Sequence, residues 1–253
     1  MKFSIVLPYY KRASLLSRTL DSFRRLYRGR TDYEVIIIED TKNKRDDIEA
    51  AKLRSLIREF PDLEIVCLLQ DKRPDTMCPG TAYNMGIAAS RGEYIVISNP
   101  ECMHEQDILA GLDTEFSRDP GCYVVCACLG LDEQGNPATW YQHGQHKDHK
   151  LNHCTAISRV NYDRIGGFDE AFADGYARTD IDFVWAVMNA GIPIVERDDL
   201  LTVHQWHPRG YGIPVHELRR LMDISVARLR AKWQGKKINY DQAWVKRVQE
   251  ACW

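Results

Sequence analysis

The strongest constraint on the fold is a repeated alternation of short apolar runs with longer amphipathic stretches in the first half of the chain. The runs are rich in β-branched residues and read FSIVLP (3–8), EVIIIED (34–40), EIVCLL (64–69) and YIVIS (94–98). Segments with helical periodicity follow them, at residues 12–27, 44–59, 80–90 and 105–117. Continuous apolar strands separated by helices predict a parallel sheet covered by helices on both faces.

Composition excludes attraction of the whole molecule to nucleic acid. The 253 residues include 34 Lys and Arg against 36 Asp and Glu, which gives a net charge of −2. This balance produces no overall field that draws in a polyanion, so any basic function must be local. The length suits either two small domains or one α/β domain with a large core.

Hydropathy and cysteine usage indicate a cytoplasmic protein. No apolar segment approaches the roughly 20 residues needed to cross a bilayer, and the N-terminal stretch MKFSIVLPYYKR lacks the core of a signal peptide. The eight cysteines include no CxxC pair, and several lie in strand-like runs. We interpret them as reduced core residues, with a metal cluster or a disulfide set as the alternative.

Polar residues follow three of the four predicted strands. Residues 8–12 (PYYKR) follow the first, residues 39–41 (EDT) the second, and residues 99–101 (NPE) the fourth. Ligands of open α/β sheets bind beyond the carboxyl ends of the strands. Acids at two strand ends and a cation at a third therefore predict a charged ligand at this edge.

The second half of the chain has a weaker pattern. Residues 122–131 (CYVVCACLGL) predict a strand, 132–137 (DEQGNP) a turn, and 140–153 (WYQHGQHKDHKLNH) a polar loop. Four histidines recur in the loop at spacings of three and four: His143, His146, His149 and His153. On a helix they would share one face and suggest zinc, but the composition favours a loop.

Five segments occur in an order that is familiar: IVLPYYKR, VIIIEDT, YNMGIAASRGEYIVISNPE, IGGFDEAFADGYARTDIDF and VHQWH. Together, over about residues 3–207, they resemble glycosyltransferases of the family 2 type, which have a GT-A fold. The resemblance implies an α/β fold with a Rossmann-like, mostly parallel sheet flanked by helices. It also implies a glycosyltransferase domain over 1–210, with 211–253 as a helical C-terminal extension packed on the same domain.

The resemblance also implies an activity. Members of this family transfer a sugar from a nucleotide-diphosphate donor, usually with inversion and with Mn²⁺ or Mg²⁺ as cofactor. For this chain we expect a UDP-sugar donor and a glycan or lipid-linked glycan acceptor, without a nucleic-acid partner.

The resemblance assigns nucleotide contacts to six positions: Pro8, Tyr10, Arg12, Asp40, Asn84 and Asn99. Asp40 would accept a hydrogen bond from the base, and Arg12 would hold diphosphate oxygens. The alternatives are that Asp40 caps the following helix and that Arg12 is a solvated residue of a first helical turn.

The helix start around Asn84 departs from the family pattern in one position. Asn84 and Gly86 match the family's N-x-G, where small residues let the helix approach the nucleotide. The preceding residue is often Arg in the family and is Tyr83 here, so Lys72 or Arg73 is a candidate to replace that charge.

The metal site departs further. The family places Asp-x-Asp where this chain has Asn99-Pro100-Glu101, so one carboxylate is lost and one is lengthened. Glu101 remains able to bind a hard divalent cation, and His204 matches a family histidine that completes the coordination shell. Asn99 would either reach the ribose or bind the metal weakly through its carbonyl oxygen. His207 is the reserve ligand, and a degenerate, metal-free site is the alternative.

Asp180 matches the family's catalytic base, which takes the proton of the attacking hydroxyl. Thr179 replaces the acid that precedes it in the family, and an N-cap pair formed by Thr179 and Asp180 is the alternative. Asp182 lies off the helical face of Asp180 and is not expected to share its role. For the acceptor we expect contacts from Asp169 and from Trp140. Trp140 and Tyr141 would stack on sugars in a mobile flap.

The C-terminal segment predicts an amphipathic helix. Its expected apolar stripe is Val215, Leu218, Leu221, Met222 and Leu229. Residues 215–250 carry nine Lys and Arg against four Asp and Glu. This excess is typical of a solvated face, and the alternative is a peripheral contact with the inner face of the membrane or a lipid-linked acceptor.

Two other function classes stay open at this stage. A non-catalytic relative that binds a nucleotide sugar or glycan is suggested by Asn99 and Thr179. A nucleotidyltransferase shares strand-end phosphate chemistry, but the first strand is not followed by a Gly-rich loop with a Lys.

Overall fold

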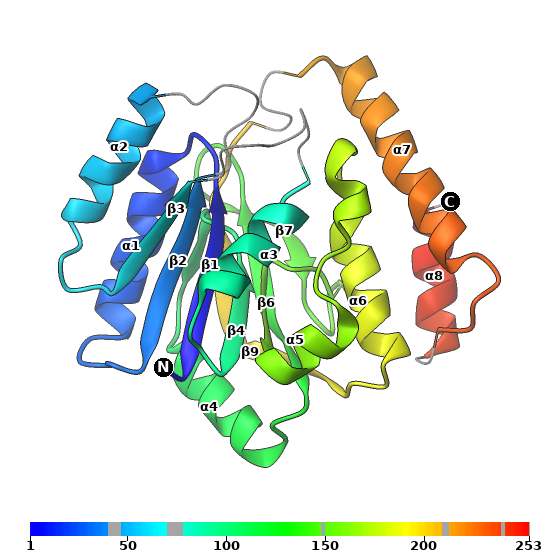
Figure 1. The fold of residues 1–253 in the computed structure, drawn as a ribbon, viewed down its shortest axis with the longest axis horizontal. Helices are drawn as coiled ribbons and strands as arrows, with labels where there is room; N and C mark the ends of the chain where they lie inside the picture. The colour runs from blue at the N-terminus through cyan, green and yellow to red at the C-terminus, as the bar shows by residue number, and fades with distance from the viewer. Residues whose placement is uncertain (40–46, 70–77, 148–149, 209–212, 239–240, 253) are drawn as a thin grey trace.

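A computed structural model describes residues 1–39, 47–69, 78–147, 150–208, 213–238 and 241–252 (Figure 1). Within these ranges one curled sheet has the strand order β3-β2-β1-β4-β8-β6-β9-β5, with β7 added on β6. The strands of its parallel half are β1 (Phe3–Tyr9), β2 (Tyr33–Glu39), β3 (Ile65–Leu69) and β4 (Tyr94–Ser98). The other strands are β5 (Cys102–His104), β6 (Tyr123–Leu131), β7 (Pro137–Gln142), β8 (Cys154–Ser158) and β9 (Ile194–His204).

Helices cover both faces of the sheet (Figure 1). The first four are α1 (Ala13–Leu26), α2 (Asp47–Arg58), α3 (Gly80–Ala89) and α4 (Ile108–Arg118). They are followed by α5 (Arg159–Ile165), the 3₁₀ helix η1 (Glu170–Asp174), α6 (Thr179–Asn189), α7 (Val215–Trp233) and α8 (Gln242–Cys252). The α/β class predicted from the sequence is therefore confirmed.

Alternate residues of the central strands enter two separate cores. Val6 and Ile36 pack in one core with residues of α3, α6 and α7, whereas Ile5 and Val35 pack in the other with residues of α1, α2 and α4. All four side chains are 0% exposed. Burial on both faces explains why these strands read as continuous apolar runs.

The first half matches the predicted elements closely, and the second half corrects two expectations. Residues 140–142 belong to strand β7 rather than to a loop, which places Trp140 in the sheet. In α7 the buried residues are Leu221, Ser225, Leu229 and Trp233. Val215 is 74% exposed, so it does not belong to the buried stripe.

Gly86 lets α3 approach the sheet. A Cβ atom at this position would lie 2.4 Å from Cδ1 of Ile38 and 2.8 Å from Cγ1 of Val6. Any larger residue would therefore push α3 off β1 and β2. The close approach that the sequence suggested is, in this structure, an approach to the sheet.

The C-terminal helices α7 and α8 lie outside α6 (Figure 1). Trp233 of α7 contacts Trp185 of α6 edge to face, with ring centroids 5.9 Å apart, and Trp244 of α8 joins the same core. A domain boundary at residue 210 stays a prediction, because residues 209–212 lie outside the described part. Among the helices described, none is both long and apolar enough to cross a membrane.

Candidate active site

Glu101 is the centre of a charged cluster at the carboxyl end of β4. Its side chain is buried, and three cationic or ionisable groups face its Oε1 atom: Arg12 Nη1 at 2.5 Å, His207 Nε2 at 3.1 Å and His204 Nε2 at 3.6 Å. Burial alone would raise the pKa of Glu101, but the two imidazoles and the charge of Arg12 lower it far below its ordinary value. The carboxylate is therefore ionised at neutral pH.

The local fold explains how the members of this cluster meet. Arg12 is the N-cap residue of α1, and Lys11 before it has a φ of 48°, in the left-handed region. Such a conformation is costly for a residue other than glycine, and it often marks a functional segment. His204 ends β9, where its backbone pairs with Cys102, the neighbour of Glu101.

Gln205 is a further tie that the sequence did not reveal. Its amide nitrogen Nε2 donates to the carbonyls of Leu15 (2.9 Å) and Glu101 (3.3 Å), and its backbone N–H also donates to the Glu101 carbonyl (3.0 Å). Gln205 is 2% exposed. Gln205 therefore links the end of β9 to α1 and to the backbone of Glu101.

The cluster suits a divalent cation. One ligand atom from each of Glu101, His204 and His207 lies within 4.8 Å of the others. Within the described part of the chain, the second carboxylate oxygen, Oε2, is buried and has no hydrogen-bond partner. A buried, unpaired anionic oxygen beside two imidazoles fits a metal ion such as Mn²⁺. The guanidinium of Arg12 is then a competitor for the same carboxylate.

Asn99 and Tyr83, the two departures from the family pattern on this side, contact each other. The hydroxyl of Tyr83 lies 3.0 Å from both the Ser98 carbonyl and Asn99 Oδ1. Nδ2 of Asn99 lies 3.3 Å from Nδ1 of His153. Tyr83 is 2% exposed and stacks on Phe168. This tyrosine therefore holds the end of β4 against α3, whereas Lys72 and Arg73 lie outside the described residues.

Asn84 makes four hydrogen bonds to α5, to η1 and to the loop between them. Its Nδ2 donates to the Phe168 carbonyl and to Glu170, and its Oδ1 accepts from Tyr162 Oη and from the Phe168 N–H. These bonds give Asn84 a structural role at the GGFDE turn. Its contact with a nucleotide stays a prediction.

Asp180 stands in the first turn of α6, after a strained backbone. Ala177 and Arg178 have φ values of 60° and 73°, and Arg178 is an N-cap residue whose side chain caps nothing. The proposed Thr179 cap is therefore wrong, although Asp180 Oδ1 accepts from the Ile181 N–H at 2.9 Å. Strain of this kind fixes the direction of the following side chain at many functional sites.

Asp180 and Glu101 are both near enough to Tyr83 to act on its hydroxyl electrostatically. Burial raises the pKa of Tyr83 well above its ordinary value, and the carboxylates Glu101 and Asp180 add to that shift. Asp182 points elsewhere, as expected, since it is 2% exposed and accepts from Trp233 Nε1 (2.6 Å) and Lys232 Nζ (2.8 Å) of α7.

The acceptor residues expected from the sequence are separated by the sheet. Neighbouring residues of a strand point to opposite faces. Trp140 contacts His143 and His146, with the latter stacked at 5.2 Å between ring centroids. Tyr141 instead contacts His153 and His204, at 4.6 and 4.8 Å. Tyr141 is thus the aromatic residue that β7 brings to the charged cluster.

The loop histidines do not form one group. His143 and His146 contact each other on the Trp140 side, whereas His153 contacts His204. His149 lies outside the described residues, so a zinc site made of all four has no support here.

Three other expected positions have mixed placements. Asp169 is the N-cap of η1 and its Oδ2 accepts from Lys232 at 2.8 Å. Pro8 is buried within β1 and pairs with Ile38 of β2. Tyr10 follows β1, with the ammonium of Lys11 at 5.6 Å from its ring. Their ligand roles stay predictions.

Asp40, the expected contact of the base, lies outside the described residues. The preceding residue, Glu39, ends β2 and is 3% exposed. The strand that would present Asp40 is therefore in place, and its role stays a prediction.

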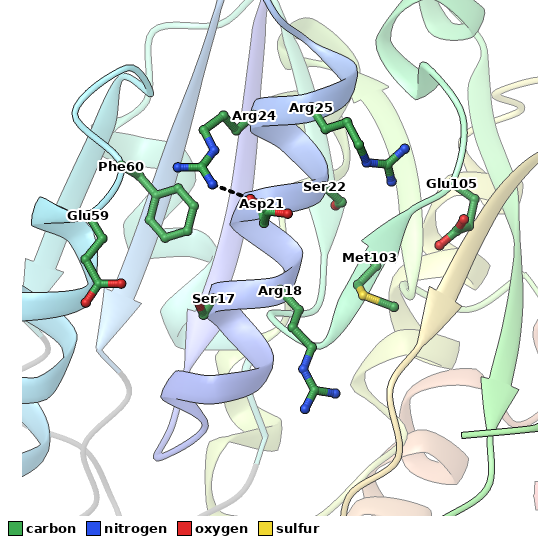
Figure 2. A pocket seen from close by; sticks show the side chains of 10 residues that line it. All are labelled: Ser17, Arg18, Asp21, Ser22, Arg24, Arg25, Glu59, Phe60, Met103 and Glu105. Carbon is green, nitrogen blue, oxygen red and sulfur yellow. Dashed lines mark hydrogen bonds and ion pairs between the residues drawn. The ribbon is translucent and has the colours of Figure 1, made fainter. Parts of the chain in front are cut away.

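A hollow of about 540 Å³ on the outer side of α1 contains none of these residues (Figure 2). Arg24 in its wall bonds to Asp21 and lies 4.9 Å from the ring centroid of Phe60. Arg18 and Glu105 lie toward its other side in Figure 2. Its lining holds three arginines and three acids, so it does not select one charge class of ligand.

Solved structures with the same fold include sugar transferases. TarS of S. aureus in complex with UDP-GlcNAc matches with a TM-score of 0.67 and 13% identity, over 100% of this chain and 71% of that one. A mannosyltransferase of Pyrobaculum calidifontis in complex with GDP-Man and Mn²⁺ matches with a TM-score of 0.64 and 18% identity, over 93% and 65%. At these identities the likeness concerns the fold, which is the GT-A fold.

Two curated relatives are also glycosyltransferases. Validoxylamine A glucosyltransferase of Streptomyces hygroscopicus is 24% identical over 266 residues, which cover 85% of this chain and 58% of that protein. Poly(ribitol-phosphate) beta-glucosyltransferase of Bacillus spizizenii is 29% identical over 144 residues, which cover 56% of this chain and 21% of that protein. The chain thus matches less than two thirds of the length of either relative. Residues 4–181 match the family described as glycosyl transferase family 2, and this match spans more than half of the sequence, so the chain belongs to that family.

Proposed function

We propose that this protein transfers a sugar, with inversion, from a nucleotide-diphosphate donor to a hydroxyl group of a glycan. The observation that supports the proposal most is the buried, ionised Glu101 with two imidazoles and a guanidinium at its Oε1, at the edge where α/β sheets bind ligands. This arrangement is suited to hold a cation against a diphosphate. Family membership and the sugar-transferring relatives support the same reaction class.

The residues that would hold the cation are Glu101, His204 and His207. When bound, a divalent cation neutralises charge that develops on the departing nucleoside diphosphate. Two imidazole ligands favour Mn²⁺ over Mg²⁺, which prefers an all-oxygen shell. Once a cation occupies Glu101, the guanidinium of Arg12 would be released to contact the diphosphate, the role that the resemblance gives it.

Asp180 would act as the general base. In a single displacement, its carboxylate takes the proton from the acceptor hydroxyl while that oxygen bonds to the anomeric carbon. The bond from the anomeric carbon to the diphosphate oxygen breaks on the opposite face, and the electron pair leaves with the nucleoside diphosphate. The fixed backbone at Ala177 and Arg178 supports this role, because a general base must be held in one direction.

For the donor we propose a UDP-sugar, with Asp40 reading the base. TarS, whose structure matches this chain over its full length, was solved in complex with UDP-GlcNAc. For the acceptor we propose a glycan or a lipid-linked glycan, contacted by Tyr141 together with Trp140 and Asp169.

A peripheral membrane contact through α7 has reduced support. Two of its basic residues pair with acids of the same chain, Arg228 with Asp174 and Lys232 with both Asp169 and Asp182. Each such pair removes a positive charge from the surface available to anionic lipids. The contact remains part of the proposal only for the exposed basic positions of α7.

A binding protein without catalysis is the second candidate, and one observation favours it. Arg12 already neutralises Glu101, as an internal cation would in a site that has lost its metal. A binder would retain nucleotide-sugar affinity without breaking the donor.

Donor hydrolysis separates the candidates. Purified protein is incubated with a panel of nucleotide sugars and Mn²⁺, and the released nucleoside diphosphate is measured. We expect slow release from one donor, faster release when a glycan acceptor is added, and loss of both in Asp180→Asn. Release of pyrophosphate would indicate a nucleotidyltransferase, and tight binding without release would indicate the binder.

A further inference from the structure

A second group of potential metal ligands lies beside the charged cluster and shares no residue with it. The sulfur atoms of Cys102 and Cys128 and a ring nitrogen of His153 lie within 4.8 Å of one another. Both cysteines are 0% exposed, and neither is in a disulfide. His153, which directly precedes β8, is only partly buried.

The sheet register explains why these residues meet. Cys102 of β5 and Gly130 of β6 both pair with His204 of β9, so their side-chain directions are on the face that His204 occupies. Cys128 is two residues before Gly130 and therefore points to that same face. The ring of His153 stands edge to face with that of His204, at 5.5 Å between centroids. The three residues thus form a layer directly next to the Glu101 cluster.

Their chemistry differs from that of the Glu101 cluster. Two thiolates and an imidazole form a soft ligand set, which selects zinc-class ions over Mg²⁺ or Mn²⁺. Tetrahedral zinc with Zn–S bonds of about 2.3 Å holds two sulfurs about 3.8 Å apart. The sulfur atoms of Cys102 and Cys128 lie within 4.8 Å of each other, which is compatible with this spacing. Two thiolates also balance the charge of a dication, so the ion and its two thiolate ligands together would carry no net charge in this buried position.

We propose that Cys102, Cys128 and His153 bind a zinc-class ion at a site distinct from that of the nucleotide-associated cation. Three protein ligands leave a fourth position for water. The partly exposed imidazole gives the ion a route from the surface. The proposal does not depend on the sugar-transfer reaction.

The side chain of Asn99 lies where it can orient the imidazole of His153. A metal-bound imidazole is normally oriented by a hydrogen bond at its other nitrogen. The amide of Asn99 lies 3.3 Å from His153 Nδ1. With its oxygen turned toward the ring, it would accept a hydrogen bond from Nδ1–H, while its nitrogen would donate to the Tyr83 hydroxyl, which donates in turn to the Ser98 carbonyl. The ring of Tyr141 packs on His153 from another side. Asn99 would thereby orient a ligand of the inner ion rather than coordinate the outer one.

Cobalt spectroscopy tests the site, because thiolate ligands give Co²⁺ an intense near-ultraviolet charge-transfer band that carboxylate and imidazole ligands do not give. Wild-type protein is stripped with a chelator and titrated with Co²⁺. We expect the band to saturate at about one equivalent, the stoichiometry of a single tetrahedral site, and to disappear when one equivalent of Zn²⁺ is added.

Four variants locate the site. The band should be lost in Cys102→Ser and Cys128→Ser and retained in two controls, Cys122→Ser and Glu101→Gln. Cys122 is equally buried, at 0% exposure, but belongs to neither group of potential metal ligands, and Glu101→Gln removes the only carboxylate of the outer cluster. If the band is retained in Glu101→Gln, the thiolate site binds metal independently of the proposed catalytic cation site, so failure of one proposal can be told apart from failure of the other.

A further variant guards against misfolding of the cysteine variants. His153→Ala keeps both thiols and alters a partly exposed residue, and it should weaken Co²⁺ affinity by at least about tenfold, as loss of a ligand or its support does. No band in the wild type, a band unchanged in His153→Ala, or a band lost in Glu101→Gln would overturn the proposal.

Discussion

Arg12 holds the carboxylate on which we expect a divalent cation to bind, so removing Arg12 should strengthen metal binding to the nucleotide-free protein. Arg12 Nη1 is 2.5 Å from Glu101 Oε1, and the two side chains are only 10% and 7% exposed. A cation that takes Glu101 as a ligand must displace this guanidinium or share the oxygen with it. Arg12→Gln keeps the polar character of the position and removes the competing charge.

The expected gain follows from the strength of the interaction that the metal must replace. A hydrogen bond to a charged group contributes about 1.5–3 kcal/mol. Since about 1.4 kcal/mol corresponds to a factor of ten, Arg12→Gln should tighten Mn²⁺ binding by roughly 10–150-fold. Affinity for the nucleoside diphosphate should change in the opposite direction, because the same guanidinium is expected to contact the diphosphate.

Electron paramagnetic resonance of free Mn²⁺ during titration, without nucleotide, measures this affinity directly. Glu101→Gln gives the background, because it removes the anionic ligand. Arg18→Gln is the matched control, since Arg18 lies on the same helix, is exposed, and contacts Gln205 at 3.5 Å rather than Glu101. If Mn²⁺ affinity in Arg12→Gln is equal to that of the wild type or weaker, Arg12 does not compete with a cation for Glu101.

Three further substitutions test the base, the α6–α7 contact and a buried carboxylate. Asp180→Asn should keep nucleotide affinity and lower turnover by about 10²–10⁴-fold, measured as nucleoside diphosphate release; undiminished turnover would exclude this base. Asp182→Ala should lower the free energy of unfolding in urea by about 2–4 kcal/mol, because it leaves the buried Trp233 indole donor unpaired and the Lys232 ammonium with Asp169 alone, and the exposed-pair control Asp174→Ala should lose under about 1 kcal/mol; equal losses would contradict this. Burial would raise the pKa of Glu34, but hydrogen bonds from Arg91 and a serine lower it below its ordinary 4.5, so its stabilisation is present above that pH and is lost as pH falls through the folded-state value. The difference in Tm between wild type and Glu34→Gln should therefore shrink below pH 4.5, and a constant difference would refute the assignment.

The parallel half of the fold was predictable from the sequence because both faces of its strands are buried. Val35, Ile36, Ile37 and Ile38 are all 0% exposed, so the run could only be a covered strand. Strand β7 was missed because its residues are mostly exposed or half-buried and it pairs along one side only, on β6. A strand of this kind has neither an apolar run nor a clear alternation of apolar and polar residues, so the sequence pattern does not predict it.

The sequence predicted those residues of the site that lie at the end of a strand, because their position follows from the local pattern alone. Glu101 and His204 were expected together, and their side chains face each other. The bonds of Gln205 to α1 and to the Glu101 carbonyl join residues that are 190 and 104 positions apart, and no local pattern encodes such a contact. The meeting of Cys102 with Cys128 depends in the same way on sheet register, which a one-residue shift would abolish.

Three of the departures from the family pattern, Tyr83, Asn99 and Thr179, lie near one another in the structure. Tyr83 bonds to Asn99, and a Cβ atom on Gly80, one turn before Tyr83, would lie 3.8 Å from Cγ2 of Thr179. Tyr83 and Thr179 are thus buried where α3 meets the end of β4 and the start of α6, and neither position has room for a solvated long charged side chain. The family pattern has an arginine and two acids at these three positions, so their joint replacement removes one positive and two negative charges. Glu101 would then be the anionic ligand of the proposed cation site, and Arg12, which pairs with it in this structure, would balance its charge until a cation takes the place of the arginine.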